Sequence, residues 1–454
     1  MIDSLLTILF FLLGLIGTLL IISLIIVVHE LGHYYAARLC GLVSHSVNIG
    51  FGRVLFRAKD VHKTLWQLHL WPLGGYVDLC GESKAKINKF LKLSYPKKVF
   101  IMLGGIIVNV LCAVLLFWCC NSLGYEYKKT VVGTVIKPTL ASQSGMLSGD
   151  LITQMNGNKV ITWKDVAFNL ILTKAFGDKL RIQVMRSGQP IKLKTISTQD
   201  LSLLAKGGLF NVFGILPRAE EWKPVIDFVM PDSPAQLAGL QKGDHVVSIG
   251  NITINDANEL LTFIRNHPNQ TVKITFIRAQ NKYTKMVNIS SQGFISDTGY
   301  LGIKTAIPDK TPALYGRIDR SVLHNLSYAI YETYQYVLLQ FATLCLLFTG
   351  SVSTDTLGGP IIILSMTFSL FSLQTLISLL HWIAVINISL AFINLLPIPV
   401  FDGGRILILT IERILGKRIK PSTQGFIDRL TLSLLLGLFA MITYNDVARI
   451  LGLL

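Results

Sequence analysis

The central part of the chain contains no cysteine. The six cysteines are Cys40, Cys80, Cys112, Cys119, Cys120 and Cys345, so none lies between residues 121 and 344. This spacing excludes a small exported domain that depends on disulfide bonds in that segment. It also provides no CxxC pair of the kind that binds structural zinc.

The chain is also poor in charge, with 15% charged and 51% hydrophobic residues. It is too apolar for an ordinary soluble protein of several domains and too polar for a helical bundle alone. Acidic residues are fewer than basic ones, and the net charge of +16 raises the question of nucleic-acid binding. The basic residues, however, gather beside apolar segments, as Lys97 and Lys98 do before the run that starts at Val99. This placement is typical of a cytoplasmic membrane face, so we expect no nucleic-acid partner.

The first apolar run, Leu5 to Val28, has no basic residue before it. A cleavable signal peptide needs a basic region, a shorter apolar core and a cleavage site of small residues. The run instead continues directly into His29-Glu30-Leu31-Gly32-His33. We therefore expect a retained membrane helix.

Four segments are long and apolar enough to span a bilayer core of roughly 30 Å: residues 5–36, 99–120, 373–396 and 429–445. The loop from Arg38 to Lys98 has eleven Lys and Arg residues against three acidic ones, which predicts a cytoplasmic location. The N-terminus and residues 121–320 then lie outside the cytoplasm. The basic stretch after Asp402 predicts that this residue lies on the cytoplasmic side.

The region 332–380 is apolar but is interrupted by polar and glycine residues, among them Ser353, Asp355 and Gly358. To reach a cytoplasmic Asp402 from outside, the chain must cross the membrane once or three times. We favour one crossing, with residues 321–349 as an amphipathic helix at the outer interface. Three crossings remain the alternative.

The middle of the chain contains an internal repeat. Thr139–Gly157 aligns with Ser233–Asn251 at a constant offset of 94 residues, with Ala, Gly, Gly and Asp at matching positions. A strand is expected before each copy, at Val131–Ile136 and Val225–Met230, and a helix and a further strand after it. A period of this length predicts two tandem globular domains rather than a solenoid.

Both copies resemble bacterial PDZ domains, because the second retains nearly intact the stretch SPAxxAGLxxGD. In the first copy Leu140 replaces the proline and Ser144 the alanine. Each copy ends on a short segment, Phe213-Gly214-Ile215 or Leu301-Gly302-Ile303, that resembles the strand bordering a PDZ peptide groove. Such grooves bind peptide C-termini by strand addition. The alternative is that both domains are spacers with empty grooves.

The motif that indicates chemistry is His29-Glu30-Leu31-Gly32-His33, an HExxH sequence. On a helix, residues i and i+4 lie on one face, so both imidazoles can reach one metal ion. Glu30 then lies beside them as a base for a water molecule activated by zinc. Ionisable side chains at the end of an apolar run are costly in lipid unless they are paired or coordinated, which favours a functional site over a chance match.

A catalytic zinc usually has three protein ligands and one open position. The third candidate is Asp402, which follows Asn394-Leu395-Leu396-Pro397-Ile398-Pro399 and precedes two glycines. Prolines interrupt the helix, and non-helical backbone at membrane depth is tolerated when it is buried or lines a cavity. Asn394 offers an amide donor for a substrate carbonyl or a developing oxyanion. The alternative for Asp402 is a simple turn that leaves the membrane.

Taken together, these motifs resemble the site-2 protease family of intramembrane zinc metalloproteases, peptidase family M50. The resemblance covers nearly the whole chain. It implies that His29, His33 and Asp402 bind Zn²⁺, that Glu30 is the general base and that Asn394 contacts substrate. It also implies that Gly74, Gly75, Tyr76 and Val77 belong to a membrane-reentrant β-loop whose edge holds an unwound substrate. The alternative for this loop is a plain cytoplasmic hairpin. The segment before Asn109 lacks the proline that relatives usually have there, which leaves its backbone in question.

The predicted fold is a polytopic α-helical membrane protein with about four transmembrane helices. Two tandem α+β PDZ domains are inserted between the second and third helices. The predicted parts are an N-terminal membrane domain (1–120), two PDZ domains (125–220 and 221–310) and a C-terminal membrane domain (321–454).

The predicted function is hydrolysis of peptide bonds within transmembrane segments of single-span membrane proteins already shortened by another protease. Family resemblance suggests anti-sigma factors in a stress response, or signal-peptide remnants, as substrates. The predicted location is the bacterial inner membrane, with the PDZ domains in the periplasm and the active site toward the cytoplasm. The alternatives are a non-catalytic PDZ scaffold and a metal transporter. A transporter predicts ligand motifs in both halves, whereas this chain has a single HExxH.

Overall fold

The computed structural model describes residues 2–79, 89–124, 126–177, 179–198, 209–218, 222–291, 299–306, 312–317, 321–351, 358–372 and 376–450. Four helices in this part of the chain are long and apolar enough to cross a membrane: α1 (Ile2–Leu39), α3 (Tyr95–Ser122), α11 (Leu376–Leu395) and α13 (Pro421–Ile450). Each of the four predicted spans lies on one of them, although residues 373–375 are outside the described residues. Lys84, Lys86, Ser353 and Asp355 also lie outside them.

The helix α3 begins earlier than predicted. Its N-cap is Ser94, and a proline occupies its first turn, where the missing N–H has no intrahelical partner to lose. Lys97 and Lys98 therefore belong to this helix rather than to the loop before it. The helix continues without a break through Ile106, so the absence of the family's usual proline leaves a regular backbone.

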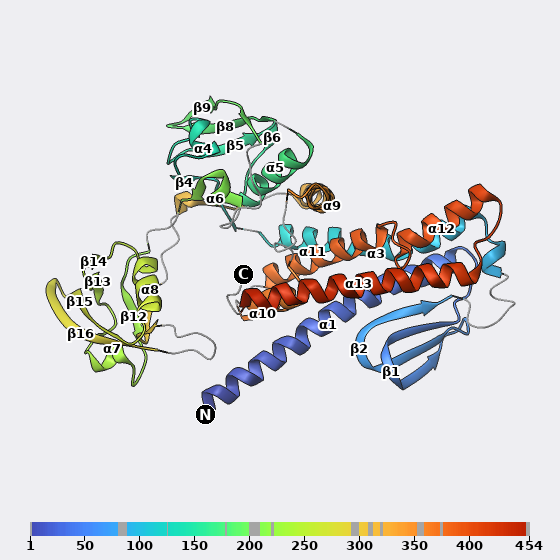
Figure 1. The fold of residues 1–454 in the computed structure, drawn as a ribbon, viewed down its shortest axis with the longest axis horizontal. Helices are drawn as coiled ribbons and strands as arrows, with labels where there is room; N and C mark the ends of the chain where they lie inside the picture. Colours follow the sequence, from blue (N-terminus) through green and yellow to red (C-terminus); the bar gives the residue numbers. More distant parts are fainter. Residues whose placement is uncertain are drawn as a thin grey trace.

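The helix α3 contacts two of the other three long apolar helices, α1 and α11 (Figure 1). At its crossing with α1, Gly32 and Gly104 allow the two backbones to touch. A Cβ on Gly32 would lie 2.3 Å from the carbonyl oxygen of Gly104, and a Cβ on Gly104 would lie 2.5 Å from the oxygen of Gly32. Small residues permit this close approach of membrane helices.

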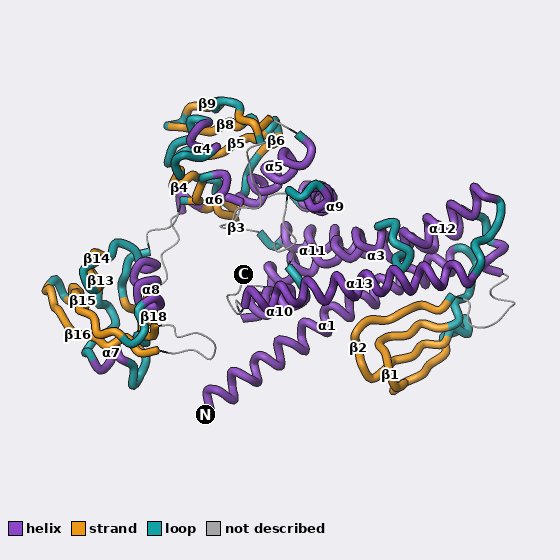
Figure 2. The backbone as a smooth tube through the Cα atoms, viewed as in Figure 1, coloured by secondary structure: helices purple, strands orange, loops and turns teal. Residues whose placement is uncertain are grey.

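A long hairpin follows α1 and consists of β1 (Ser46–Lys59) and β2 (Leu65–Asp78). The start of β1 pairs on one side with Leu65–Leu68 and on the other with Gly75–Asp78, because β2 curls back around it. Residues 75–78 thus form an outer strand of this sheet. The hairpin contacts α1 through β2 (Figures 1 and 2).

The segment between α3 and the next long helix forms two β-rich modules, each with its own hydrophobic core. The first module has the elements β4 (Val132–Val135), α4 (Leu140–Gln143), β5 (Leu151–Met155), β6 (Asn158–Lys159), α5 (Trp163–Phe176), β7 (Lys179–Leu180), β8 (Ile182–Arg186), β9 (Gln189–Lys192), β10 (Ile196–Ser197), α6 (Leu209–Phe213) and β11 (Ile215–Pro217). Its sheet has the strand order β6-β5-β8-β9, and β11 pairs with β4.

The second module has the elements β12 (Ile226–Val229), α7 (Pro234–Leu237), β13 (His245–Ile249), β14 (Ile252–Thr253), α8 (Ala257–Asn266), β15 (Gln270–Arg278), β16 (Asn281–Ser291), β17 (Gly299–Tyr300) and β18 (Ile303–Thr305). Its sheet has the order β14-β13-β15-β16-β17, and β18 pairs with β12. The last strand of each module therefore pairs with its first.

The repeat has an identical polar contact in both modules. Asp150 and Asp244, the aligned aspartates, are fully buried, and each accepts two hydrogen bonds from one arginine, Arg186 or Arg278. The same arginine also donates to the carbonyl of the aligned glycine in each module. Bidentate pairing of this kind satisfies a buried carboxylate and explains why the Gly-Asp turn occurs twice.

One detail of the repeat was predicted wrongly. Neither closing segment is a continuous strand: Phe213 ends α6 and Ile215 begins β11, whereas Leu301 and Gly302 lie outside strands and Ile303 begins β18. Gly214 connects α6 to β11 with φ of +96°, and a Cβ there would lie 1.9 Å from Oγ1 of Thr139. Only glycine fits this turn without strain.

The inserted segment is closed at its base by β3 (Glu126–Lys128) and β19 (Tyr315–Arg317), which pair just after α3 and just before α9 (Val322–Phe348). A short 3-10 turn, η1 (Pro312–Leu314), precedes β19. In Figure 1, α9 is seen end-on, whereas α3, α11 and α13 run across the view. The helix α9 thus lies across the bundle where the interfacial helix was predicted, and it is not among the four candidate spans.

Two further helices lie in the C-terminal part that the structure describes: α10 (Pro360–Ser372) and α12 (Asp402–Leu415). The helix α10 contacts α1 and α13. The helix α12 was not predicted; it is amphipathic and begins at Asp402 itself. Asp402 therefore lies at a helix N-terminus.

Candidate metal centre

Two histidines of α1 and one aspartate of α12 meet within the helical bundle. Nε2 of His29 and Nε2 of His33 are 3.2 Å apart, and each is 3.2 Å from Oδ2 of Asp402. The three side chains are 6%, 12% and 17% exposed. The three atoms thus form an equilateral triangle that is largely shielded from water.

The triangle fits a zinc ion. Zinc binds nitrogen and oxygen ligands at about 2.0–2.2 Å in tetrahedral geometry, so two ligand atoms of one site lie roughly 3.3–3.5 Å apart. Without a cation or a proton between them, the lone pairs of the two Nε2 atoms and of Oδ2 would repel one another at this distance. Three ligands also leave one position open, as catalytic zinc sites do.

Helix geometry explains how α1 supplies two of these atoms. His29 and His33 are four residues apart and lie on one face, one turn apart. Their rings meet edge to face with centroids 4.8 Å apart. Nδ1 of His33 is 2.9 Å from the carbonyl oxygen of Ile101 on α3, which fixes the orientation of that ring.

Glycine on α3 leaves room for the two rings. A Cβ on Gly105 would lie 2.5 Å from Cε1 of His29 and 2.6 Å from Nε2 of His33. Any side chain at this position would displace the imidazoles. No motif around Gly105 indicated this requirement.

The position of Asp402 depends on the two glycines that follow it. A Cβ on Gly403 would lie 2.1 Å from the carbonyl oxygen of Leu395, and one on Gly404 would lie 2.0 Å from that of Ile398. The first turn of α12 is therefore packed directly against the chain that leaves α11. This packing directs the carboxylate back toward α1.

Glu30 contacts the β-hairpin. Its Oε2 accepts a hydrogen bond of 2.9 Å from the backbone N–H of Val77 in β2. Val77 belongs to the part of β2 that forms the outer strand, residues 75–78. The candidate base and the outer strand thus lie side by side.

The glycines of this strand have different roles. Gly74 has φ of +120°, and a Cβ on Gly75 would lie 2.5 Å from the carbonyl oxygen of Asn48 in β1. Tyr76 is exposed, and its ring stacks on Phe51 at 6.4 Å between centroids. Asn394 lies half-buried on the last turn of α11, and its contact with substrate remains a prediction.

A polar cluster attaches α1 to the far end of the hairpin. The hydroxyl of Tyr34, next to His33, donates to Oδ2 of Asp60 at 2.6 Å and accepts from Arg38 at 2.8 Å. The hydrogen bond from Tyr34 lowers the pKa of Asp60 to about 2, although partial burial opposes this. Sequence reasoning missed this contact, because the residues are distant in the chain and have no motif.

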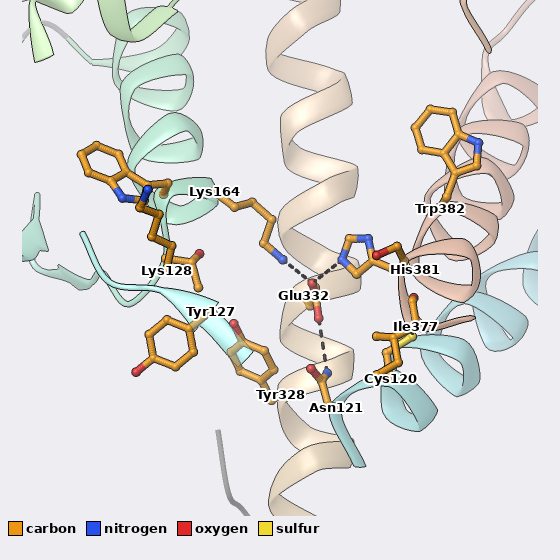
Figure 3. A pocket seen from close by; sticks show the side chains of 13 residues that line it. Cys120, Asn121, Tyr127, Lys128, Lys164, Tyr328, Glu332, Ile377, His381 and Trp382 are labelled. Atoms are coloured by element: carbon orange, nitrogen blue, oxygen red, sulfur yellow. Dashed lines mark hydrogen bonds and ion pairs between the residues drawn. The ribbon is translucent and has the colours of Figure 1, made fainter. Parts of the chain in front are cut away.

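A second ionisable cluster lies where the first module meets the membrane helices (Figure 3). Glu332 of α9 is 3% exposed and pairs with Lys164 of α5 and with His381 of α11, and it also accepts from Asn121 at the end of α3. Burial alone would raise the pKa of Glu332, but the hydrogen bond from His381 and the charge of Lys164 hold it below its ordinary value. A cavity of about 400 Å³ borders this cluster. On the apolar helix α11, His381 thus has Glu332 as its partner.

Comparison with known proteins points to one family. The sequence model described as "Peptidase family M50" matches residues 17–438. Protease RseP of Yersinia pestis is 29% identical over 449 residues, and the match covers 94% of this chain and 97% of the relative. Regulator of sigma-E protease RseP of Escherichia coli (strain K12) is 28% identical over 452 residues with the same coverage. Regulator of sigma E protease of Haemophilus influenzae is 26% identical over 440 residues, again with this coverage.

A solved PDZ domain of an SdrC-like protein from Listeria monocytogenes also matches. It covers 19% of this chain and 90% of the solved chain, at 20% identity and a TM-score of 0.17. This score is too low to support an argument about the fold.

Proposed function

The chain belongs to peptidase family M50 and is a multi-pass membrane zinc metalloprotease of regulated intramembrane proteolysis, and on this premise we propose which of its residues perform the reaction. The zinc ligands are His29, His33 and Asp402, and the general base is Glu30. The observation that carries this assignment is the triangle of two Nε2 atoms and one Oδ2 atom with edges of 3.2 Å.

Zinc bound at this site would polarise the scissile carbonyl and lower the pKa of a coordinated water molecule. Glu30 takes the proton of the attacking water and returns it to the leaving amine, as a base beside an HExxH metal site does. The hydrogen bond from the N–H of Val77 keeps the carboxylate of Glu30 in place. The low exposure of the site restricts access of bulk water.

The substrate is held as an extended strand. A helix in lipid satisfies its own backbone hydrogen bonds, so hydrolysis requires local unwinding. Gly74 and the outer strand that follows it, with Gly75, Tyr76 and Val77, offer backbone groups beside Glu30. Strand addition there would bring the scissile bond toward the metal, with Asn394 as a further amide contact.

The two β-rich modules are tandem PDZ domains, with the boundaries 125–220 and 221–310. Their matching strand pairs and their matching Arg–Asp contacts support this assignment. They lie between the membrane parts 1–120 and 321–454, on the periplasmic side of the inner membrane. Their grooves would bind peptide C-termini or exclude bulky exported domains.

The substrates are single-span membrane proteins that another protease has already shortened. The relatives named as regulators of sigma E support anti-sigma factors as the substrate class, and signal-peptide remnants are the second class. The active site faces the cytoplasmic half of the membrane, in accord with the basic residues between α1 and α3.

The test is cleavage of a model transmembrane substrate by the purified protein, with and without a zinc chelator. Glu30→Gln should lower kcat by at least ~10²-fold while zinc stays bound, because the amide cannot accept a proton. Glu412→Gln, a carboxylate on α12 that contacts the N–H of Ile419, is the matched control and should retain activity. Turnover by Glu30→Gln at the wild-type rate would contradict the assignment, and so would resistance to the chelator.

A further inference from the structure

His29 has a second polar contact, on the side of its ring opposite the candidate metal. Nδ1 of His29 lies 3.2 Å from Nδ2 of Asn109, a residue of α3 whose side chain is fully buried. Oδ1 of Asn109 has no hydrogen-bond partner among the described residues. A buried amide with an unpartnered oxygen, in contact with a candidate metal ligand, suggests a role beyond packing.

The position of the proton on the His29 ring determines whether Asn109 must donate or accept a hydrogen bond. When Nε2 of a histidine binds a metal, the ring proton is on Nδ1, and Nδ1–H needs an acceptor. His33 has such an acceptor in the carbonyl oxygen of Ile101. His29 has the side chain of Asn109 at the equivalent place, but with the amide nitrogen facing Nδ1, so two donors would oppose each other.

A rotation of the amide by 180° removes this conflict. The oxygen and nitrogen of an asparagine amide have nearly the same shape, so the rotation exchanges them without moving other atoms. Oδ1 then faces Nδ1–H of His29. A buried asparagine can therefore act as an acceptor when the metal is present.

We propose that Asn109 is a positioning residue for the metal centre: its amide oxygen accepts from Nδ1–H of His29 and thereby holds Nε2 toward the metal. The proposal rests on the function proposed above. The helix α3 would then contribute twice, because Gly105, one turn before Asn109, provides the space for the rings. Asn109 and Ile101 together fix the orientation of both histidines from the same helix.

The test is the zinc affinity of the purified full-length protein, measured by competition with a chelator of known affinity. Asn109→Leu has a similar volume but no acceptor, and we expect its affinity to fall by roughly 10–100-fold. Asn109→Asp keeps an acceptor oxygen and should restore the affinity to within about threefold of wild type. This rescue distinguishes a hydrogen bond from a simple packing effect.

Asn387→Leu is the matched control. Asn387 is also a buried asparagine of a membrane helix, and its amide donates to the carbonyl of Ile383 in its own helix. Its substitution should leave the zinc affinity unchanged. If Asn109→Leu does not fold, Asn109→Ala and Asn109→Asp provide the same comparison.

Two results would overturn the proposal: zinc affinity of the Leu or Ala variant equal to wild type, or an Asp variant that binds as weakly as the Leu or Ala variant. His29→Ala separates this failure from failure of the proposed function. If His29→Ala loses zinc while Asn109→Leu binds it normally, the positioning role alone is wrong. If His29→Ala binds zinc as tightly as wild type, the proposed zinc site is wrong as well.

Discussion

The metal centre depends on single residues that have no functional group. Gly105 is the clearest case, because a Cβ at this position would lie within 2.6 Å of both imidazoles. Gly105→Ala should therefore displace His29 or His33, and zinc affinity and kcat/KM should each fall by at least ~10²-fold. Misplacement of reacting groups by about 1 Å is sufficient for such a loss. The measurement is zinc content after dialysis, together with cleavage of the model substrate.

Gly437→Ala on α13 is the control for this prediction. A Cβ at Gly437 meets no atom within 4 Å, so the substitution should leave zinc binding and activity unchanged. If Gly105→Ala retained zinc and activity, the rings would have space that the described packing does not allow. The role given to α3 would then be wrong.

At the scale of single residues, sequence motifs indicated all three proposed zinc ligands. The spacing of HExxH and the carboxylate after the prolines indicated three ligands, and the structure brings His29, His33 and Asp402 together. The sequence motifs did not indicate the role of Gly105 or the contact of Glu30 with Val77. These depend on how α3 and β2 pack against α1, which no local pattern encodes.

At the scale of elements, the N-terminus of the short helix α10 is capped by a side chain from another helix. Asp446 of α13 is fully buried and accepts hydrogen bonds from the backbone N–H groups of Gly359, Ile361 and Ile362. These groups belong to the start of α10, where N–H groups lack intrahelical partners and where a negative charge is favourable. A side chain on another helix thus caps α10 and attaches it to α13.

We expect Asp446→Ala to loosen the start of α10. The loss of charged hydrogen bonds at a helix N-terminus should lower its local opening free energy by roughly 2 kcal/mol, which corresponds to ~30-fold faster hydrogen exchange. The measurement is hydrogen–deuterium exchange of peptides that cover residues 359–365. Thr443→Ala is the control, because its hydroxyl donates to the carbonyl of Phe439 in its own helix. Equal exchange in both variants would contradict the capping role.

The long apolar helices were predicted from the sequence, whereas a shorter amphipathic helix was missed. All four spans correspond to helices, since a run of about 20 apolar residues has few alternatives to a membrane helix. The helix α9 was predicted from the parity of crossings. The helix α12 was missed, because its amphipathic pattern follows a break at two prolines and was interpreted only as a basic stretch.

At the scale of the whole molecule, the described residues show how the first module meets the membrane helices. The helix α5 lies against α9, where Phe168 packs edge to face on Tyr336 with centroids 5.2 Å apart. Glu332 occupies the centre of this contact and joins α5, α9, α11 and the end of α3 (Figure 3). The position of the module therefore depends on a buried carboxylate.

We expect Glu332→Gln to weaken the attachment of this module. Removal of one partner leaves Lys164 and His381 without their counter-charge, and breaking a buried pair is strongly destabilising. Because Lys164 and His381 remain 27% and 32% exposed, we expect an effect of only ~1–2 kcal/mol. The measurement is hydrogen–deuterium exchange in α5 and α9, which should rise by about 5–30-fold.

Asp227→Asn is the matched control for this charge removal. Asp227 pairs with Lys242 in the second module, where the two side chains are 45% and 76% exposed, so its loss should change little. Unchanged exchange in α5 and α9 of Glu332→Gln would show that the aromatic contacts alone hold the module.

The order of the parts along the chain was predictable, because the repeat, the apolar runs and the basic loop each have a pattern visible without coordinates. The junction at Glu332 was not predictable. Its four side chains come from segments up to 260 residues apart, from Asn121 to His381, and none belongs to a motif. Family membership, in contrast, followed from motifs and was confirmed by the match over residues 17–438.

One zinc ion held by side chains of α1 and α12 can be observed by X-ray absorption at the zinc edge of the purified protein. We expect one zinc per chain with a nitrogen and oxygen shell at about 2.0–2.2 Å, and its loss in Asp402→Ala. A sulfur shell at about 2.3 Å, or an unchanged spectrum in Asp402→Ala, would contradict this expectation.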